Sequence, residues 1–307
     1  MVRISNSTPF KLPSILGWLG PMRTEFFLGQ LDGQQFIQTA KGVVGGPNGI
    51  SPQPFIHGVK ISFKLTPNIE LGFSRTVVFS GEEPPFTFKS FWKSFTAFST
   101  NGANDTIAMD AGDRHVGFYF SYRVPRLRKY LTLYTDSFCE DDPSPLGNSP
   151  WRCAWSPGIY LPQLPRLAKL DFRAEGVETE VTDFAGAIGV NYSNFVYPNS
   201  YSNDGRIIGS WVGREGVGMQ LSSTYWLSPL NKINLGFRHQ GVDHDFLQGG
   251  WLNDISAKTD LMIRPQLMLS GTAQYEQWNF PLLTNTTKSS LLLSVGLTVH
   301  PKWKLGR

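Results

Sequence analysis

The sequence predicts an all-β protein: an antiparallel transmembrane β-barrel with about twelve strands present, which we expect to be part of a larger barrel. Three observations predict this fold. Apolar and polar residues alternate along runs that are long enough to cross a bilayer at a tilt. Short turns marked by proline alternate with long loops. Charged residues make up only 17% of the chain, below the roughly 25% of ordinary soluble domains, whereas aromatic residues reach 13%.

The composition also excludes two other classes of protein. The formal net charge of +4 is too small for nucleic-acid binding, and the basic residues are too scattered along the chain. No run of about eighteen consecutive apolar residues occurs in the sequence, which excludes transmembrane helices.

Three parts of the chain are expected to differ in role. Residues 1–23 are expected to form an N-terminal segment on the periplasmic side, residues 24–303 the outer-membrane barrel domain, and residues 304–307 a tail. The best apolar run near the start, Ile15–Leu19, is interrupted by Gly17 and is shorter than the core of a signal peptide. The chain is then either soluble and cytoplasmic, or a mature form, a fragment or a late start of a protein of the cell outer membrane. The alternation described below favours the outer membrane, and we expect a fragment or a late start.

The expected strands follow one another from the first apolar run, residues 25–30, to the last, residues 290–299. Between them, every second residue is apolar in the runs 55–65, 169–175, 231–240 and 254–263. Side chains of a strand point alternately to opposite faces, so each run has one apolar and one polar face. The polar faces mix charges of both signs, as in Asp171, Arg173 and Glu175, which suits a water-filled barrel interior. A β-sandwich or a soluble barrel is the alternative.

The connections differ in length from one end of the strands to the other. Short connections are expected at 66–68, 124–128, 161–167, 228–231 and 264–266, and long ones at 80–113, 140–155, 181–216, 242–251 and 278–289. This arrangement is typical of outer-membrane barrels, whose long loops lie outside. Aromatic residues near the strand ends are those expected of an aromatic girdle: Tyr122, Tyr225, Trp226, Trp278 and Trp303.

The two cysteines, Cys139 and Cys153, flank a turn-rich segment. They are expected to form a disulfide that closes this loop if it faces an oxidising space, with two free thiols as the alternative. Neither cysteine has a second Cys or His pair at ligand spacing, so the sequence predicts no metal site, and it predicts no cofactor.

Catalysis is not expected from the sequence. No G-x-S-x-G motif occurs, and among the five histidines only His115 and His244 remain as candidate bases. His57 and His239 fall in the apolar register of their strands, and His300 lies at a strand end. An outer-membrane lipid or glycan hydrolase that uses His115 or His244 is the weaker alternative, and a general porin or transporter is the stronger one.

Several ordered segments resemble the Wzi family of capsule-assembly outer-membrane proteins. They are FIHGVKISFKLTPNIELGFSRTVVFSGE, AGDRHVGFYFSYRVPRLRKYLTLYTDSFCEDDPSPL, WSPGIYLPQLPRLAKLDFRAEG, IIGSWVGREGVGMQLSSTYWLSPLNKINLGFRHQ and FLQGGWLNDISAKTD. The resemblance implies a lectin-like, non-catalytic barrel that binds capsular or exopolysaccharide and helps assemble or anchor it at the cell surface. It also implies contacts with outer-membrane lipid and with the polysaccharide export machinery. Because family barrels have more strands, it implies the C-terminal part of such a barrel.

Sugar recognition pairs aromatic faces with planar hydrogen-bonding groups, and the long-loop side of the expected barrel holds both kinds of residue. For each tryptophan the alternative role is in the girdle or in a loop core. The residues expected to contact polysaccharide are Trp92, Asp113, Arg114, Asp136, Asp141, Asp142, Trp155, Trp211, Arg214, Trp251 and Asp254.

Overall fold

The computed structural model describes residues 1–33, 36–39, 42–45, 53–81, 84–97, 111–127, 129–140, 153–180, 192, 194, 197 and 201–300, and the statements below concern these residues. For 36–39 and 42–45 only the backbone is described. No helix in this part of the chain is long and apolar enough to cross a membrane.

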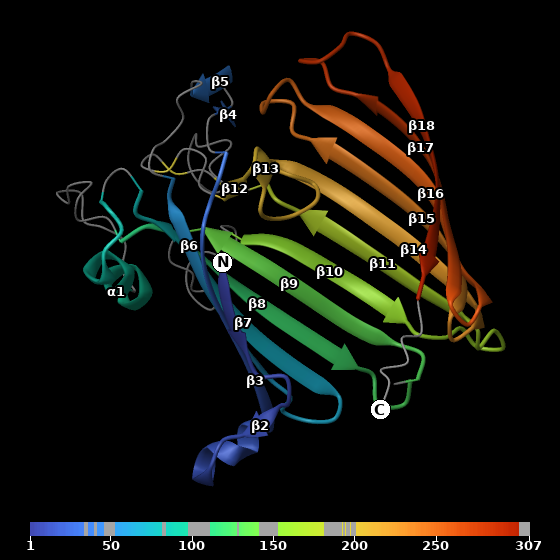
Figure 1. The fold of residues 1–307 in the computed structure, drawn as a ribbon, viewed down its shortest axis with the longest axis horizontal. Coiled ribbons are helices and arrows are strands. Elements are labelled where there is room, and N and C mark those ends of the chain that lie inside the picture. Colours follow the sequence, from blue (N-terminus) through green and yellow to red (C-terminus); the bar gives the residue numbers. More distant parts are fainter. Residues whose placement is uncertain are drawn as a thin grey trace, which may run out of the picture.

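One large antiparallel sheet of fourteen strands forms the body of the molecule (Figure 1). Along the sheet the order is β1-β3-β6-β7-β8-β9-β10-β11-β14-β15-β16-β17-β18, and β2 pairs with the start of β3. The bounds are β1 Val2–Ser5, β2 Phe10–Lys11, β3 Pro21–Gln30, β6 Phe55–Phe63, β7 Ile69–Phe79, β8 Asp113–Arg123, β9 Thr132–Glu140, β10 Cys153–Leu161, β11 Leu170–Glu178, β14 Gly216–Ser228, β15 Asn231–Val242, β16 Gly250–Arg264, β17 Leu267–Asn279 and β18 Lys288–Val299.

The other elements lie outside this sheet. They are two small two-stranded sheets, β4 (Phe36–Thr39) with β5 (Gly42–Gly45) and β12 (Ser202–Asn203) with β13 (Arg206–Ile207), a 3-10 helix η1 (Ser14–Leu19), and the helix α1 (Phe88–Thr96). The all-β antiparallel prediction is confirmed. The long strands match the expected runs, whereas the short strands β1 and β2 were not expected from the sequence.

The predicted boundary at residue 24 does not coincide with a break in the sheet. β3 already begins at Pro21, and β1 pairs along it from Val2 opposite Leu28 to Ser5 opposite Glu25. The start of the chain therefore adds an edge strand, while β18 forms the other edge in the described part. The predicted tail, 304–307, lies outside the described residues.

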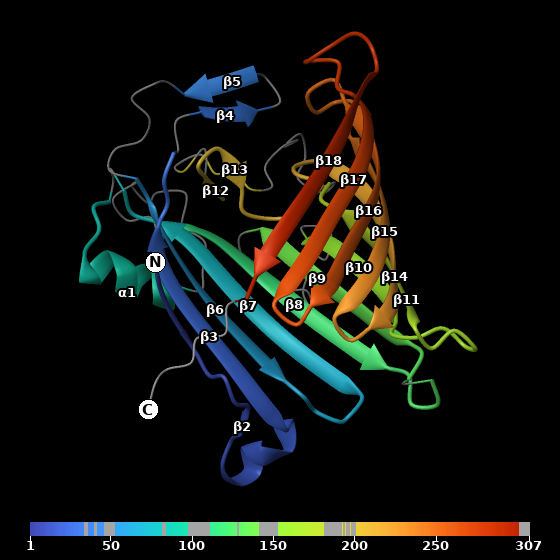
Figure 2. The same ribbon diagram turned by 45° about the vertical axis from the view of Figure 1, so that its right-hand side comes forward.

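The ladder register gives the sheet two unlike faces. Val59 pairs with Phe26 and Ile61 pairs with Phe73 on one face, whereas Lys60 pairs with Glu25 and Ser74 on the other, so apolar and polar residues separate as expected, with Arg75 opposite Val59 as an exception. The sheet is curved, and β12 and β13 lie over the loop end of its concave side (Figure 2). The polar face is the concave one, because Asp136 and Glu175 line a hollow together with Trp211 of the segment that carries β12 and β13. Large apolar side chains of the convex face are exposed: Leu235 and Ile255 at 60% and Val295 at 80%.

The turns and loops lie at opposite ends of the strands, as predicted. The strands β8 and β9 join through residues 124–131, and β16 and β17 through only 265–266, at one end. At the other end, long segments such as 80–112 and 179–215 connect β7 to β8 and β11 to β14. A further long connection, 31–54, was not expected and carries β4 and β5.

The aromatic girdle is only partly as predicted. Tyr122 pairs with Ile69 and Tyr225 with Ile233, which places both tyrosines on the apolar face. Trp226 instead donates from Nε1 to Asp171 Oδ2 at 2.9 Å, and Trp278 shares the parity of Glu276, which pairs with Asp254 on the polar face. The prediction was wrong for these two tryptophans because position near a strand end does not fix the face, and Trp303 lies outside the described residues.

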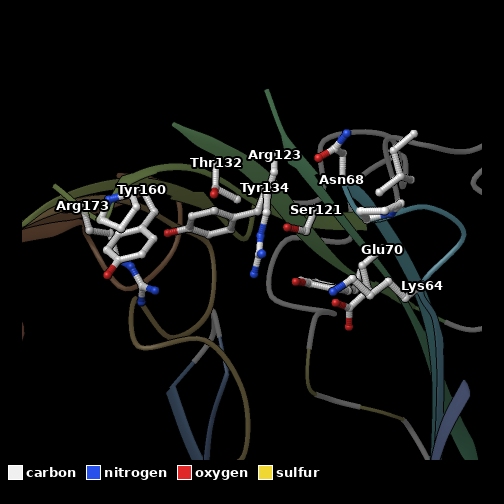
Figure 3. Close-up of a pocket in the computed structure, with 13 residues that line it drawn as sticks. Lys64, Asn68, Glu70, Ser121, Arg123, Thr132, Tyr134, Tyr160 and Arg173 are labelled. Carbon is white, nitrogen blue, oxygen red and sulfur yellow. The ribbon is translucent and has the colours of Figure 1, made fainter. Parts of the chain in front are cut away.

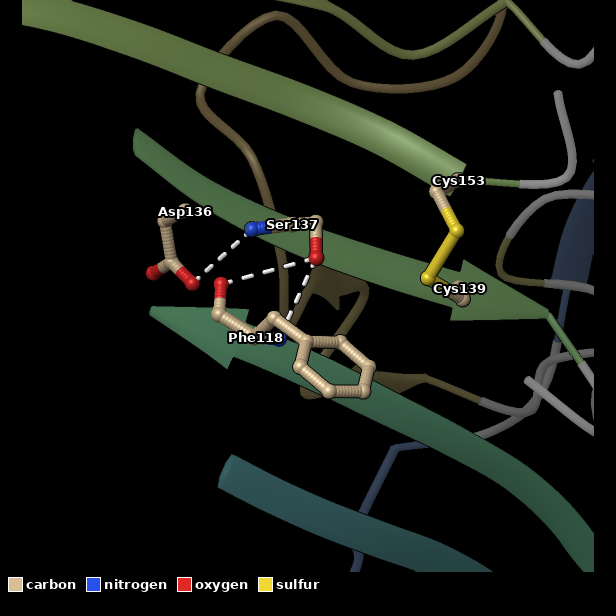
Figure 4. Close-up of a disulfide and its surroundings, with 5 residues drawn as sticks. All are labelled: Phe118, Asp136, Ser137, Cys139 and Cys153. Carbon is tan, nitrogen blue, oxygen red and sulfur yellow. Dashed lines mark hydrogen bonds between the residues drawn. A yellow bond between two sulfur atoms is a disulfide. The ribbon is translucent and has the colours of Figure 1, made fainter. Parts of the chain in front are cut away.

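Cys139 and Cys153 form the predicted disulfide (Figure 4). The two residues stand directly opposite each other on β9 and β10, with their Cα atoms 3.9 Å apart, and both are buried. The bond closes the long loop between these strands at its base. Two free thiols, the alternative, do not occur.

We predict that removing this disulfide lowers the free energy of unfolding. A bond that closes a loop of about 15 residues stabilises a protein by about 3 kcal/mol, mainly through the unfolded chain. The double variant Cys139→Ala, Cys153→Ala should therefore unfold at lower denaturant concentration than the oxidised wild type in the same detergent. The reduced wild type serves as the control and should match the variant. Equal unfolding midpoints for all three proteins would contradict the prediction.

Candidate functional site

Two adjoining hollows form a groove on the concave face. They share Tyr119 of β8 and Tyr134 of β9, and have volumes of about 570 and 540 Å³. The strand period of two places every second residue of β7 to β11 on this face, so side chains far apart in the sequence line one surface. We call them the lower hollow, at the short-turn end, and the upper hollow, toward the long loops.

In the lower hollow an arginine lies between two tyrosines (Figure 3). The guanidinium carbon of Arg173 is 5.2 Å from the ring centre of Tyr160 and 5.6 Å from that of Tyr134. The three residues come from β11, β10 and β9, and Tyr160 pairs directly with Arg173. Cation–π contacts of this kind hold a guanidinium in place while leaving its N–H donors for a ligand.

Further charged side chains surround this arginine. Lys64, Arg123 and Glu70 also line the lower hollow, together with Asn68, Ser121 and Thr132. Three cations and one carboxylate give this hollow a positive balance. Arginine and lysine bind carboxylates and hydroxyls through several N–H donors.

A glycine allows the Tyr134 ring to lie across β10. Gly158 pairs with Tyr134, and a Cβ at Gly158 would lie 2.3 Å from the ring carbon Cζ. In this position the Tyr134 hydroxyl donates to Glu175 Oε2 at 2.9 Å. Gly158 therefore sets the shape of the groove where its two hollows meet.

The upper hollow combines carboxylates with aromatic side chains from a long loop. Asp136 of β9 and Glu175 of β11 lie on its strand side, and Tyr192 and Trp211 come from the connection between β11 and β14. The Ser210 backbone N–H donates to the Tyr192 hydroxyl at 3.0 Å, which orients that ring. Tyr192 also stacks on Phe138, with ring centres 5.2 Å apart.

The loop end of the concave face is capped by a tyrosine cluster. Tyr192, Tyr197 and Tyr201 pack with Leu31, Ile56 and Val78 in one buried core, supported by Phe27 and Phe138. The Tyr201 hydroxyl donates to the Thr76 carbonyl at 2.9 Å and accepts from Thr76 Oγ1 at 3.1 Å. Burial, together with the charge of Asp113, raises the pKa of Tyr201 well above its ordinary value.

Beneath this cap, strand pairing brings three chemically active side chains together. Asp113, His115 and Glu140 are buried, and their ligand atoms lie within 4.8 Å of one another. His115 Nε2 and Glu140 Oε2 share a hydrogen bond, and the centre of the His115 ring is 4.0 Å from that of Tyr201. The set has donor types that could hold a divalent cation, although no metal site was expected from the sequence.

Neither candidate catalytic base lies in the groove. His115 is fully buried under Tyr201, whereas the His244 side chain is 92% exposed and lies 3.6 Å from Asp245. A base must reach the proton that it abstracts, and His115 has no exposed surface from which to do so.

The predicted polysaccharide residues divide between the two faces. On the concave side, Asp136 and Trp211 line the upper hollow, while Asp113 lies beneath the cap. On the convex side, Arg114 pairs with Val77, Trp155 with Ser137 and Trp251 with Gly241, and Trp92 belongs to α1. The structure therefore does not bring the eleven residues together. Asp141 and Asp142 lie outside the described residues.

Asp254 and Arg214 have roles in the protein interior. Asp254 is 2% exposed, and its Oδ2 accepts from Arg238 Nε at 2.9 Å and from Gln274 Nε2 at 2.8 Å. Arg238 in turn lies 5.7 Å from the Trp211 ring, so Asp254 positions this contact. Arg214 lies 5.3 Å from the Phe246 ring, and burial lowers its pKa.

Sequence reasoning missed most of the groove residues. They lie on the polar parity of the strands: Lys64, Glu70, Tyr119, Arg123, Tyr134, Tyr160, Arg173 and Glu175. The parity itself was available from the sequence. What the sequence did not show was which strands place their tyrosines beside Arg173.

An antiparallel sheet with an apolar convex face and a polar groove lined by tyrosines defines an outer-membrane type of β protein. A sequence model of the family described as "Capsule assembly protein Wzi" matches residues 1–291. The chain belongs to this family.

The known proteins that are similar to the chain include the following two. The structure of Wzi from Escherichia coli, described as an outer membrane protein involved in group 1 capsule assembly and a carbohydrate binding β-barrel, matches with a TM-score of 0.72 and 15% identity over 98% of this chain and 61% of that one. An uncharacterized 55.8 kDa protein in the cps region of Klebsiella pneumoniae is 27% identical over 128 residues, which are 41% of this chain and 22% of that protein. The chain thus spans less than two thirds of either protein.

We predict that the protein becomes less stable at alkaline pH because Tyr201, in the tyrosine cluster, ionises. Because the pKa of Tyr201 is raised in the folded state, its contribution to stability is fully present below the unfolded pKa of about 10 and is lost as pH rises above it. Ultraviolet titration of the wild type should show one more tyrosine that ionises only with unfolding than titration of Tyr201→Phe does. Tyr201→Phe should lower the free energy of unfolding by about 1–3 kcal/mol at neutral pH, because it leaves the buried partners of the hydroxyl unsatisfied.

The same variant provides the control for pH dependence. Tyr201→Phe should lose less stability between pH 9 and 11 than the wild type does. Identical alkaline stability profiles for the two proteins would show that Tyr201 is not the group responsible.

Proposed function

We propose that this protein is a non-catalytic outer-membrane β-barrel that binds capsular or exopolysaccharide and helps assemble or anchor it at the cell surface. The observation that carries the proposal is the groove on the concave face, in which Arg173 lies between Tyr134 and Tyr160. Membership of the Wzi capsule assembly family, and the description of the E. coli Wzi structure as a carbohydrate-binding barrel, support it.

Placement in a membrane follows from the convex face. Soluble monomers rarely expose apolar patches larger than a few hundred Å². Here the exposed apolar side chains continue over several neighbouring strands, among them Phe73, Phe120, Leu235, Ile255 and Leu293. Such an apolar face is compatible with the hydrocarbon core of a bilayer.

We propose further that the sheet is one arc of a larger closed barrel. The edge strands β1 and β18 do not pair with each other in the described part of the chain. An open edge in lipid would leave a row of backbone N–H and C=O groups without partners, at several kcal/mol for each group. Additional strands between these edges would satisfy them.

The chemistry of the groove fits a glycan that carries carboxylate groups. Tyrosine faces can stack on the C–H surfaces of sugar rings. Arg173, Arg123 and Lys64 supply donors for hydroxyls and carboxylates, and Glu70 supplies an acceptor for hydroxyls. We also propose contact with the polysaccharide export machinery, on the basis of membership of the Wzi family alone.

The cap disfavours the alternative of an open porin. The strands β12 and β13 and the tyrosine cluster occupy the concave side at the loop end (Figure 2). Tyr192, Tyr197 and Tyr201 are each no more than 3% exposed, so this part of the interior is packed with side chains.

We predict that Arg173→Gln and Tyr160→Ala each weaken binding of purified capsular polysaccharide. Each removes one partner of the arginine–tyrosine contact, and we expect an affinity loss of about tenfold, which corresponds to about 1.4 kcal/mol. Biolayer interferometry with the polysaccharide immobilised measures the affinity, and the amount of cell-bound capsule measures anchoring.

Matched controls distinguish a binding defect from a folding defect. Arg264→Gln removes an exposed arginine at the end of β16, and Tyr275→Ala removes a tyrosine of the convex face. Both controls should bind like the wild type. If the controls weaken binding as much as the groove variants, or if no variant does, the groove is not the polysaccharide site.

A further inference from the structure

The helix α1 lies on the convex side of the sheet, at the end near the long loops (Figure 2). It begins with a capping box, in which Thr87 Oγ1 accepts from the Ser90 backbone N–H and Ser90 Oγ accepts from the Thr87 backbone N–H. Since the convex face would meet lipid in the proposed function, the position of α1 is unusual for a polar loop segment.

One side of α1 is fixed to the sheet. Ser94 is buried, and its hydroxyl lies 2.9 Å from His57 Nε2. Arg75, on the same face, donates to the carbonyls of Phe95 at 3.0 Å and Ala97 at 2.6 Å. These hydrogen bonds satisfy carbonyl groups at the C-terminus of the helix. They also hold the guanidinium of Arg75, the one arginine of β7, away from lipid.

Aromatic packing adds to this attachment. The ring of Phe91 lies 6.5 Å from that of Phe26 and 5.5 Å from that of His57. Phe95 lies 6.3 Å from Phe26. The helix therefore sits on β3, β6 and β7 as a fixed part of the convex surface.

The other side of α1 is exposed and carries both aromatic and basic residues. Phe88 is 77% exposed and Trp92 is 54% exposed, and their rings stack at 6.3 Å. Lys89 and Lys93, four residues apart, are exposed on the same helix, which contains no acidic residue. Large aromatic rings beside lysines are typical of helices that lie in a membrane interface.

We propose that α1 binds a phosphate-bearing lipid of the outer leaflet. Phe88 and Trp92 enter the boundary between headgroups and acyl chains, and Lys89 and Lys93 contact the lipid phosphates. Lysine stems can lie along apolar surface while the ammonium groups reach the headgroups. The inference rests on the proposed membrane placement, and it adds a lipid partner that is independent of the polysaccharide groove.

The choice of lipid over a protein partner follows from the surroundings of the helix. The exposed rings lie on the same side of the sheet as the apolar convex face, which includes Phe73 and Phe120 at 46% and 39% exposure. A lipid surface is apolar beside a layer of phosphates, which matches rings beside lysines. Nothing in α1 supplies the carboxylates that would pair with a second copy of the same helix.

Native mass spectrometry of the whole chain in detergent tests this proposal with diphosphoryl lipid A as the probe. The variant Lys89→Gln, Lys93→Gln should bind lipid A about tenfold more weakly than the wild type, because each basic group contributes to attraction to lipid phosphates. The control variant Lys11→Gln, Lys169→Gln removes the same charge from exposed positions at the short-turn end and should bind like the wild type.

Three results would overturn the proposal: equal lipid A affinity of the wild type and the α1 variant, equal affinity of the wild type for lipid A and dephosphorylated lipid A, or a Trp92-dependent dimer that forms without lipid. The α1 variant should keep wild-type affinity for polysaccharide. The lipid assay and the polysaccharide assay therefore test the two proposals separately, and failure of the lipid proposal is distinguishable from failure of the proposed polysaccharide binding.

Discussion

The hydrogen-bonded register of the antiparallel ladder is the constraint on which the rest of the structure depends. Because side chains alternate with a period of two, a slip of one residue between neighbouring strands would move a whole strand to the wrong face. The pairing of Val59 with Phe26 and of Ile61 with Phe73 keeps apolar residues together. The pairing of Tyr160 with Arg173 builds the groove. The same ladder thus creates both the convex face and the binding surface.

Each face is completed by segments from the long loops. On the concave side, Tyr201 bonds to Thr76 and closes the loop end, while Trp211 reaches the upper hollow. On the convex side, α1 covers His57 and satisfies Arg75. Both polar residues occupy the apolar parity of their strands, and they are tolerated there because the helix provides hydrogen-bond partners in place of water.

Local pattern made the strands, turns and disulfide predictable, whereas contacts between distant strands were not. The alternation in 55–65 depends only on near neighbours, and Cys139 and Cys153 flank one loop. The cluster of Asp113, His115 and Glu140 depends on the pairing of β8 with β9, which spacing along the chain does not reveal. The glycan residues proposed from loop position included Trp155, which register places on the convex face. Strand parity is therefore a better guide to the groove than proximity to a loop.

The most direct test of the two-faced sheet is a spin-label scan along β15 in reconstituted bilayers, since the wild-type chain has no free cysteine among its described residues. Single cysteines at positions 232–237 would carry the label. Collision rates with oxygen, which concentrates in lipid, should peak at Ile233, Leu235 and Phe237, and rates with a water-soluble nickel chelate should peak at Lys232, Asn234 and Gly236. Loss of this alternation, or its reversal, would contradict the account.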